Sequence, residues 1–339
     1  MGRKQCPVEG LELTNFWKNR NVAVTGATGV VGSWLVKNLL AQGANISALI
    51  YERDPVSELI RSGDISKITC IDGDLRDKDS IFKLVDSVKA ETIFHLGAQT
   101  IVGTALEDPV ETFESNILGT WNLMEVCRSK PTQIKRVLIA SSDKAYGTSK
   151  ILPYSEETPM AGEGPYDVSK SCTDLIARSY NLTYNIPTVI ARCGNIYGGG
   201  DVNWSRIVPG TIKSLLSGER PIIRSNGKFL RDYIYVEDAV QAYLKMAEAV
   251  DSHQAAGEAF NFSRQEPISV LEIYKEICLA TVGEYVEPDI QDTAKNEIID
   301  QHLDSSKARN QIGWDSNYTL EQGLQLTVSW YKKYFEELK

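Results

Sequence analysis

A glycine-rich turn after a short apolar segment constrains the fold of this chain more than any other feature. Residues 21–25 are Asn-Val-Ala-Val-Thr, and glycines follow at positions 26, 29 and 32. Apolar residues then recur at helical spacing as far as Gly43, a typical helix stop. Glycines three apart permit a tight turn, close approach of a pyrophosphate to the backbone, and close packing of helix on sheet. The segment predicts a strand, a dinucleotide-binding turn and a helix, although a tight turn alone also needs glycine.

Strand and helix patterns continue to alternate as far as position 191. The expected strands are residues 46–50, 68–71, 92–96, 136–140 and 187–191, and the expected helices are residues 79–89, 109–129 and 166–185. Strands that alternate with helices over such a length form a parallel sheet with helices on both faces. The predicted fold class is therefore α/β, a Rossmann-type doubly wound parallel sheet whose ligands lie at the carboxyl ends of its strands.

The pattern changes after Arg192, where a glycine-rich stretch is followed by short helical and strand-like pieces. Residues 232–250 have the pattern of a strand and a helix that return to the main sheet, and Thr319 and Gln322 have the spacing of a capping box before a C-terminal helix. We predict two domains. The Rossmann domain comprises residues 15–192 and about 232–262, and a smaller, discontinuous C-terminal substrate domain comprises residues 193–231 and 263–339.

Composition excludes several classes of protein. The chain has 339 residues, and its net charge of −9 argues against binding to nucleic acid or to anionic membranes. The N-terminus lacks the apolar segment of a secretory signal, and no apolar run approaches the roughly 20 residues of a membrane span. Six cysteines without a Cys-x-x-Cys pair and three histidines without metal spacing predict no disulfide and no metal site. We expect reduced cysteines and a cytoplasmic location.

The residues after the second expected strand bear on the choice of cofactor. Glu52 lies about 20 positions beyond the glycine turn, where a carboxylate binds the ribose hydroxyls of NAD and repels a 2′-phosphate. Arg53 is its neighbour and is suited to accept that phosphate instead, which makes NADP the alternative. A third interpretation treats Glu52, Arg53 and Asp54 as a solvated loop. The predicted cofactor is NAD.

A second cluster of chemically active residues follows the strand at 136–140. Residues 141–147 are Ser-Ser-Asp-Lys-Ala-Tyr-Gly, and Tyr166 and Lys170 are four apart, so that a helix places both on one face. Tyrosine is a poor base because its ordinary pKa is near 10, and a neighbouring ammonium group lowers that value. These residues predict a proton-transfer site.

The glycine turn together with the Tyr166–Lys170 pair resembles the extended short-chain dehydrogenase/reductases that act on nucleotide sugars. The resemblance extends over nearly the whole chain, since further family-like motifs lie at residues 72–77, 95–99, 192–198, 231–238 and 303–314. It implies that the Rossmann domain binds NAD and that the smaller domain binds a nucleotide sugar.

Binding residues follow from the same resemblance. The implied cofactor-binding residues are Gly26, Thr28, Gly29, Val30, Gly32, Glu52, Arg53, Asp74, Leu75, Leu96, Ala98, Asn116, Tyr166 and Lys170. The implied substrate-binding residues are Gln99, Asn195, Arg206, Arg224 and Arg231. The arginines are candidates for the substrate pyrophosphate because a guanidinium group matches phosphate oxygens. We expect His95 to be structural.

The catalytic roles are also implied by the family. Tyr166 takes the proton of the sugar 4-hydroxyl while hydride passes from C4 to NAD⁺, and Ser142 binds the same 4-oxygen. Lys170 lowers the pKa of the tyrosine and holds the nicotinamide ribose. A nucleotide-sugar 4-epimerase needs nothing more, whereas a 4,6-dehydratase must also remove the C5 proton and protonate the departing 6-hydroxyl.

Asp143 and Lys144 decide between these reactions. An Asp-Lys pair in this place resembles CDP-glucose 4,6-dehydratases, and also the inverting dehydratases of UDP-N-acetylglucosamine. It implies Asp143 as the acid to the 6-hydroxyl and Lys144 as the C5 base. The predicted function is a 4,6-dehydratase, with CDP-glucose as the expected substrate. The alternatives are a 4-epimerase, an exposed Asp–Lys ion pair without a catalytic role, and a non-catalytic NAD(P)-binding regulator.

The resemblance also implies a homodimer. Trp121 and its apolar neighbours lie on the helix expected at 109–129, through which family members form a four-helix bundle. The alternative is that these residues belong to the core.

Overall fold

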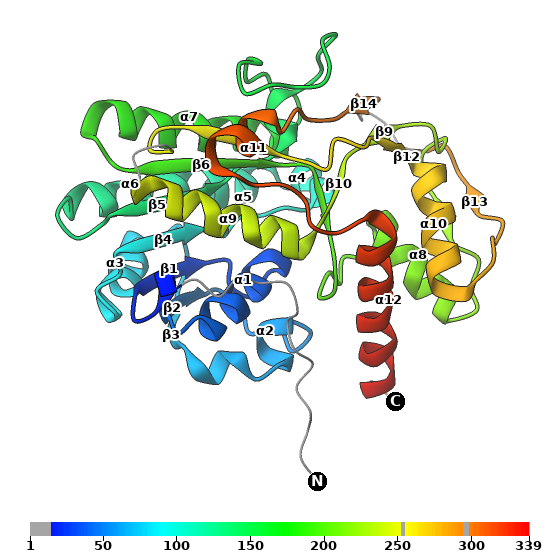
Figure 1. Ribbon diagram of the computed structural model, residues 1–339, viewed down its shortest axis with the longest axis horizontal. Helices are drawn as coiled ribbons and strands as arrows, with labels where there is room; N and C mark the ends of the chain where they lie inside the picture. Colours follow the sequence, from blue (N-terminus) through cyan, green and yellow to red (C-terminus); the bar gives the residue numbers. More distant parts are fainter. Residues whose placement is uncertain (1–14, 252–254, 294–297, 339) are drawn as a thin grey trace.

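A seven-stranded parallel sheet forms the centre of the computed structural model, which describes residues 15–251, 255–293 and 298–338 (Figure 1). Its strands are β1 (Asn21–Thr25), β2 (Asn45–Ile50), β3 (Thr69–Asp72), β4 (Thr92–His95), β5 (Arg136–Ala140), β6 (Thr188–Cys193) and β11 (Ala259–Phe262). The order is β11-β6-β5-β4-β1-β2-β3, so strands are added on one side of β1 up to β3 and then on its other side from β4 onward. The predicted doubly wound α/β fold is confirmed.

Helices cover both faces of this sheet (Figure 1). They are α1 (Val30–Ala41), α3 (Lys78–Ser87), α5 (Pro109–Phe113), α6 (Gly119–Ser129), α7 (Pro165–Tyr184) and α9 (Val236–Asp251). The expected long helix at 109–129 is formed by α5, a π-helical turn η3 (Glu114–Leu118) and α6. The shorter helices around the sheet are η1 (Asn15–Trp17), α2 (Glu58–Arg61), η2 (Asp64–Lys67), α4 (Val102–Glu107) and η4 (Asp143–Tyr146).

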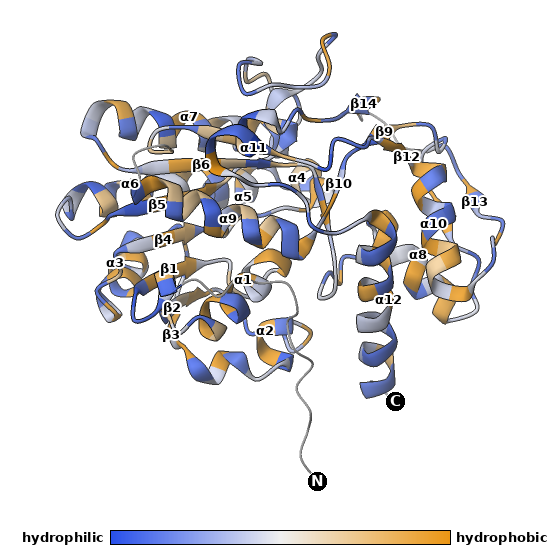
Figure 2. Ribbon diagram, in the orientation of Figure 1, coloured by the Kyte–Doolittle hydropathy of each residue, from blue (hydrophilic) through white to orange (hydrophobic). Residues whose placement is uncertain are grey.

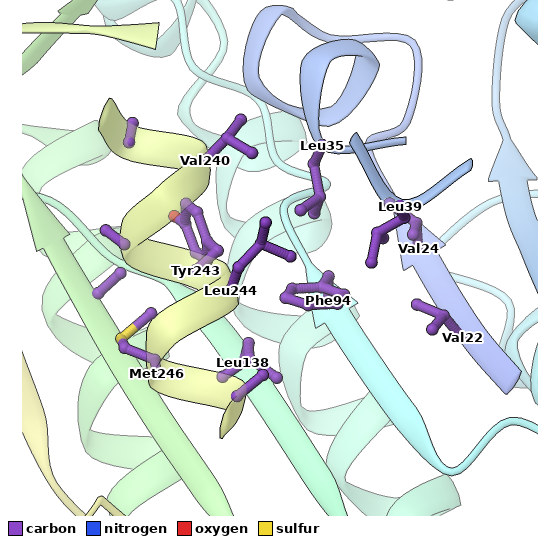
Figure 3. Close-up of a cluster of buried hydrophobic side chains, with 14 of the residues drawn as sticks. Val22, Val24, Leu35, Leu39, Phe94, Leu138, Val240, Tyr243, Leu244 and Met246 are labelled. Atoms are coloured by element: carbon purple, nitrogen blue, oxygen red, sulfur yellow. The ribbon is translucent and has the colours of Figure 1, made fainter. Parts of the chain in front are cut away.

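Alternation along the strands divides the core into two clusters. Phe94 and Leu138 face α1 and α9, as Figure 3 shows, whereas Ile93, Val137 and Ile139 pack with residues of α3, α6 and α7. Successive strand residues point to opposite faces, and here both faces are apolar because both are covered.

Residues 232–250 differ from the prediction. β10 (Tyr233–Tyr235) pairs with β7 (Asn195–Tyr197) in a separate two-stranded sheet, because its tyrosines pack with Tyr197 in the core of the second region. Only α9 returns to the main sheet, and β11 then completes that sheet beside β6. The prediction that the strand in this segment joins the main sheet is wrong.

Most of the remaining elements form a second region beside the sheet (Figure 1). They are α8 (Ile207–Leu216), β8 (Ile222–Ile223), β9 (Leu230–Arg231), β12 (Ile268–Ser269), α10 (Val270–Val282), β13 (Asp289–Ile290), β14 (Asp300–Gln301) and α12 (Leu320–Glu337). In contrast, α11 (Ser306–Ile312) packs against β11 and α9, and its Ala308 belongs to the core of the main sheet. α8, α10 and α12 share one apolar core, and Figure 2 shows the free end of α12 as hydrophilic. The expected capping box of Thr319 and Gln322 is present at α12. The domain boundaries stay a prediction.

No helix in the described part of the chain combines the length and the apolar character that crossing a membrane requires.

Candidate active site

A cleft of about 1710 Å³ lies at the carboxyl ends of the parallel strands. Its walls come from the segments that follow β1 to β6 and, on the other side, from α8, β8 and β9. Most of the predicted site residues line it: Gly26, Thr28, Gly29, Val30, Gly32, Asp74, Leu75, Leu96, Ala98, Gln99, Ser142, Asp143, Lys144, Tyr166, Lys170, Asn195, Arg206, Arg224 and Arg231. Glu52, Arg53 and Asn116, which the structure also describes, do not.

The glycine turn forms one end of the cleft. Gly26 has a φ of +72°, and a Cβ atom there would lie 2.6 Å from the backbone nitrogen of Gly97, at the point where the sheet reverses. A Cβ on Gly32 would lie 2.0 Å from the carbonyl oxygen of Gly26, so α1 packs closely on the turn. Gly29 is more open, and the first turn of α1 has no acidic residue. The free amides of that turn fit the phosphates of a dinucleotide.

The residues after β2 and β3 lie at the same end of the cleft as the glycine turn. Arg53 donates a hydrogen bond of 2.7 Å to Asp72 at the end of β3, and half of its side chain is exposed. Tyr51, which the sequence analysis did not single out, lines the cleft. Arg76 donates to Asp74 (Nε to Oδ2, 2.8 Å). Partial burial of Asp74 acts to raise its pKa, but the hydrogen bonds and charge of Arg76 outweigh this and lower it.

Asn116 supports the cleft from behind. Its side-chain oxygen accepts from the backbone N–H of Gln99 (2.7 Å), and its side-chain nitrogen donates to the Gln99 carbonyl (2.9 Å) and to Ser169 (2.8 Å). Asn116 lies in the π-helical turn, where its own carbonyl accepts from Thr120 and from Thr173 (3.2 Å). The residue thus links the loop after β4 to α7 without entering the cleft.

His95 is structural, as expected. Its Nδ1 lies 2.9 Å from the hydroxyl of Thr25, and its Nε2 lies 3.2 Å from the hydroxyl of Thr120. Burial, with a smaller contribution from the charge of Lys170, lowers the pKa of His95 to about 3. A neutral imidazole is therefore fixed between two threonines.

Tyr166 and Lys170 lie one turn apart on α7, and their arrangement corrects one expectation. The Nζ of Lys170 is 5.9 Å from the centre of the Tyr166 ring and donates to the carbonyl of Ala140 (2.9 Å). Burial lowers the pKa of Lys170 to about 8. The pKa of Tyr166 is raised rather than lowered, because burial and the carboxylate of Asp143 both disfavour the phenolate.

Ser142 and Asp143 form a short turn that aims a carboxyl group into the cleft. The Ser142 hydroxyl caps η4 by accepting from the N–H of Lys144 (3.2 Å) and donates to Oδ1 of Asp143 (3.0 Å). Asp143 is only 3% exposed, and within the described residues its Oδ2 has no hydrogen-bond partner. Burial raises its pKa to about 6. Such a group can hold or release a proton near neutral pH.

Lys144 lines the cleft as well, and its side chain reaches β14 of the second region. Its Nζ donates to the side-chain oxygen of Gln301 in β14 (3.2 Å). An exposed Asp–Lys ion pair is contradicted by the burial of Asp143.

A network of buried polar residues holds the turn at η4 in place. The sequence did not indicate these residues as a group. The Tyr146 hydroxyl donates to Asn261 (2.7 Å) and accepts from Arg192 (2.8 Å). Arg192 in turn makes two hydrogen bonds, of 2.7 and 2.9 Å, to the buried carboxylate of Asp174. Their partners are far apart in sequence, so no local pattern indicates the network.

The three predicted arginines lie on the far wall of the cleft. Arg206 contacts Asp201 (3.0 Å), and Arg224 donates to the carbonyl of Ser205 (2.8 Å). Arg231 is 6% exposed, and its guanidinium donates to the carbonyls of Leu230 and Ile299 (both 2.8 Å).

Sequence reasoning missed other residues of the cleft wall, among them Tyr243, Cys193 and Asp167. Tyr243 lies on α9 among the apolar residues of Figure 3, where the helical pattern indicated core. Burial, reinforced by the nearby Cys193 and Tyr166, raises the pKa of Tyr243. Asp167 follows Tyr166 directly, and its position beside a predicted catalytic residue was the available signal.

Comparisons with known proteins show what this chain is similar to. A family model described as GDP-mannose 4,6 dehydratase matches residues 23–327. CDP-glucose 4,6-dehydratase of Salmonella typhimurium is 30% identical over 336 residues, which cover 94% of this chain and 92% of that protein. dTDP-glucose 4,6-dehydratase of Xanthomonas campestris is 27% identical, with 91% and 92% covered.

Solved structures of both reaction types share the fold. A UDP-glucose 4-epimerase from Thermotoga maritima, solved with UDP-glucose, has a TM-score of 0.85 and 26% identity and covers 93% of this chain and 99% of its own. A dTDP-glucose 4,6-dehydratase from Bacillus anthracis, solved with NAD, has a TM-score of 0.82 and 24% identity, with 94% and 98% covered. The fold alone does not separate epimerase from dehydratase.

Proposed function

This chain belongs to the GDP-mannose 4,6-dehydratase family, and from that premise we propose that it is an NAD-dependent nucleotide-sugar 4,6-dehydratase with CDP-glucose as its substrate. The product is the 4-keto-6-deoxy sugar nucleotide, which has lost one molecule of water. The observation that carries the proposal is the buried carboxyl of Asp143, which faces the cleft beside Lys144.

Each step assigns one proton to one side chain. Tyr166 takes the proton of the 4-hydroxyl, which Ser142 also binds, as C4 is oxidised. Because burial and Asp143 raise its pKa in the free protein, this role requires the positive charges of Lys170 and of bound NAD⁺ to favour the phenolate in the complex. Lys144 then takes the C5 proton, and Asp143 gives its proton to the 6-hydroxyl, which leaves as water. Lys144 then returns its proton to C5, and the proton held by Tyr166 restores that of Asp143. Bound NAD⁺ would supply the hydride acceptor for C4 and, once reduced, the hydride for C6, so that cofactor and side chains would be unchanged after a turnover.

The raised pKa of Asp143 suits a general acid, which a dehydratase needs and an epimerase does not. A general acid works best when its pKa lies near the operating pH, and burial brings the pKa of Asp143 to about 6. A 4-epimerase only turns the 4-keto sugar over and has no use for a second acid. The alternative of a non-catalytic NAD(P)-binding regulator is disfavoured, because such a protein needs none of Ser142, Tyr166 and Lys170.

The cofactor-binding end supports NAD over NADP. The carboxylate of Asp72 holds Arg53 by an ion pair of 2.7 Å and would compete with a 2′-phosphate for it. Further proposed cofactor contacts are the glycine turn, Asp74, Leu75, Leu96, Ala98, Tyr166 and Lys170, all of which line the cleft.

Incubation of the purified protein with glucose and mannose linked to CDP, dTDP, UDP or GDP tests the function and the nucleotide. We expect CDP-glucose to give a product lighter by one water, measured by mass spectrometry, at a rate above that of the other nucleotides. An isomer of equal mass would establish the epimerase instead, and unchanged substrates with tight NAD binding would establish the regulator.

We also propose a homodimer that forms through a four-helix bundle of α5–α6 and α7 from two copies. These helices carry exposed large apolar residues, namely Val110, Phe113, Trp121, Leu175 and Leu182. Apolar patches of this kind mark interfaces.

A cytoplasmic location is consistent with the described cysteines, all of which are free.

A charge placed in that patch should dissociate the dimer. We expect Trp121→Glu to sediment as a monomer in analytical ultracentrifugation where the unmodified protein is a dimer, because burial of an unpaired carboxylate in the bundle is costly. Tyr285→Glu is the matched control, since Tyr285 is equally exposed but lies outside these helices. A dimer of unchanged strength in Trp121→Glu would place the interface elsewhere.

A further inference from the structure

Gln301 is the only described hydrogen-bond partner of the Lys144 ammonium group. It comes from β14, 157 residues later in the chain, and its side-chain oxygen lies 3.2 Å from Nζ of Lys144. The residue is 1% exposed, and its side-chain nitrogen is buried without a hydrogen-bond partner among the described residues. A buried amide with an unused donor is unusual and calls for an explanation.

The backbone around Gln301 is held rigidly against the active-site wall. Gln301 pairs with Arg231 across the parallel strands β14 and β9. The next two residues are fixed as well, because the His302 carbonyl accepts from the N–H of Tyr154 (2.9 Å) and the Leu303 N–H donates to Asp232 (2.7 Å). The side chain therefore starts from a fixed position, as a group that orients another must.

The partner of Lys144 is neutral, and this matters for a lysine that has to act as a base. A carboxylate would accept from the ammonium form and oppose loss of its proton. An amide accepts from the ammonium form through its oxygen and, after a half-turn of its end group, donates through its nitrogen to the free amine. The unused nitrogen of Gln301 is the donor that the second arrangement requires.

Two carboxylates already face Lys144, one from its own element and one from α7. The charge of Lys144 acts on Asp143 in η4 and on Asp167 in α7. Beyond them, Asp143 interacts with Arg231 and Asp232, and Asp167 interacts with Glu163. A third carboxylate at position 301 would hold the lysine in its charged form.

On these grounds we propose that Gln301 is a positioning residue that orients the Lys144 amine and lets it lose its proton, so that the second region of the protein completes the catalytic site. The proposal rests on the proposed function, in which Lys144 removes the C5 proton. Gln301 does not itself line the cleft, in contrast to Lys144 and Arg231.

Two substitutions separate orientation from charge. Gln301→Met keeps the length of the side chain and removes both polar atoms, and we expect kcat to fall by about 10- to 100-fold with KM within about threefold. Gln301→Glu keeps a hydrogen-bond acceptor and adds a charge, and we expect the rise of kcat with pH to move upward by about 1 to 2 pH units. Gln291→Glu is the matched control, because it adds the same charge at an exposed position of the same region.

A second measurement does not depend on turnover. In protein labelled with ¹³C at lysine Cε, the chemical shift reports ionisation of each lysine, and Lys144→Arg identifies the Lys144 signal by its loss. We expect the Lys144 titration midpoint to move to higher pH in Gln301→Glu and to stay in place in Gln291→Glu. An unmoved midpoint, or a kcat of Gln301→Met equal to that of the unmodified protein, would overturn the proposal. If no nucleotide sugar is dehydrated but the midpoint moves, the proposed function fails while Gln301 still governs the protonation of Lys144.

Discussion

Tyr166→Phe should lower kcat by about 10²- to 10⁴-fold, the usual contribution of a positioned general base. The substitution removes one hydroxyl and leaves the ring that packs beside Lys170. Without the phenol oxygen, nothing accepts the 4-hydroxyl proton, and the oxidation at C4 cannot begin. The variant should therefore show neither dehydrated product nor the near-ultraviolet absorbance of reduced nicotinamide when substrate is added.

Tyr243→Phe is the matched control for this experiment. Tyr243 lines the same cleft and its substitution removes the same atom, but it has no assigned proton to transfer. We expect its kcat to stay within about tenfold of the unmodified value. If Tyr166→Phe retained activity comparable with that of Tyr243→Phe, the base would have to be another group.

The parallel sheet was predictable because each strand is short, apolar and bounded by turn residues. β1 and β5 were predicted to the residue, since their alternating core faces and the glycine or serine that follows define both ends. β10 was predicted to join the wrong sheet, because an alternating Tyr-Ile-Tyr sequence fits a main-sheet strand as well as a strand of a two-stranded ribbon. Its partner is decided by tertiary packing against Tyr197, which a local pattern does not contain.

The same distinction holds within the site. Ser142, Asp143, Tyr166 and Lys170 lie in two short motifs, and the structure brings them to one cleft. Gln301 gave no signal, because its partner is 157 residues away and a single glutamine has no pattern. The direction of the Tyr166 pKa was predicted wrongly because it depends on burial and on Asp143, which the Tyr-x-x-x-Lys spacing does not reveal.

The pH dependence of the reaction should follow the raised pKa of Asp143. An acid must carry its proton to give it away, and the protonated fraction of Asp143 falls as pH rises through about 6. We therefore expect kcat/KM to fall with a limb near that pH, because this ratio reports the free enzyme.

Asp143→Asn should stop the reaction at a later point than Tyr166→Phe does. The amide has the shape of the carboxyl but gives no proton to the 6-hydroxyl, so we expect release of the dehydrated product to fall by about 10²- to 10⁴-fold. Tyr166 and Lys144 remain intact, and the sugar should still be oxidised at C4. Reduced nicotinamide should accumulate on the enzyme, and in D₂O the C5 hydrogen should exchange while water is not lost.

Asp167→Asn separates this specific role from a general loss of negative charge. Asp167 lies next to Tyr166, interacts with Lys144 and, like Asp143, has a pKa raised by burial, so its amide changes the same local field. We expect that variant to form dehydrated product within about tenfold of the normal rate and to accumulate no reduced nicotinamide. If Asp143→Asn instead failed to oxidise C4, Asp143 would serve the first step through its contact with Ser142. If it released dehydrated product at the normal rate, another group would protonate the 6-hydroxyl, and the carboxyl that distinguishes this site from an epimerase would lose its function.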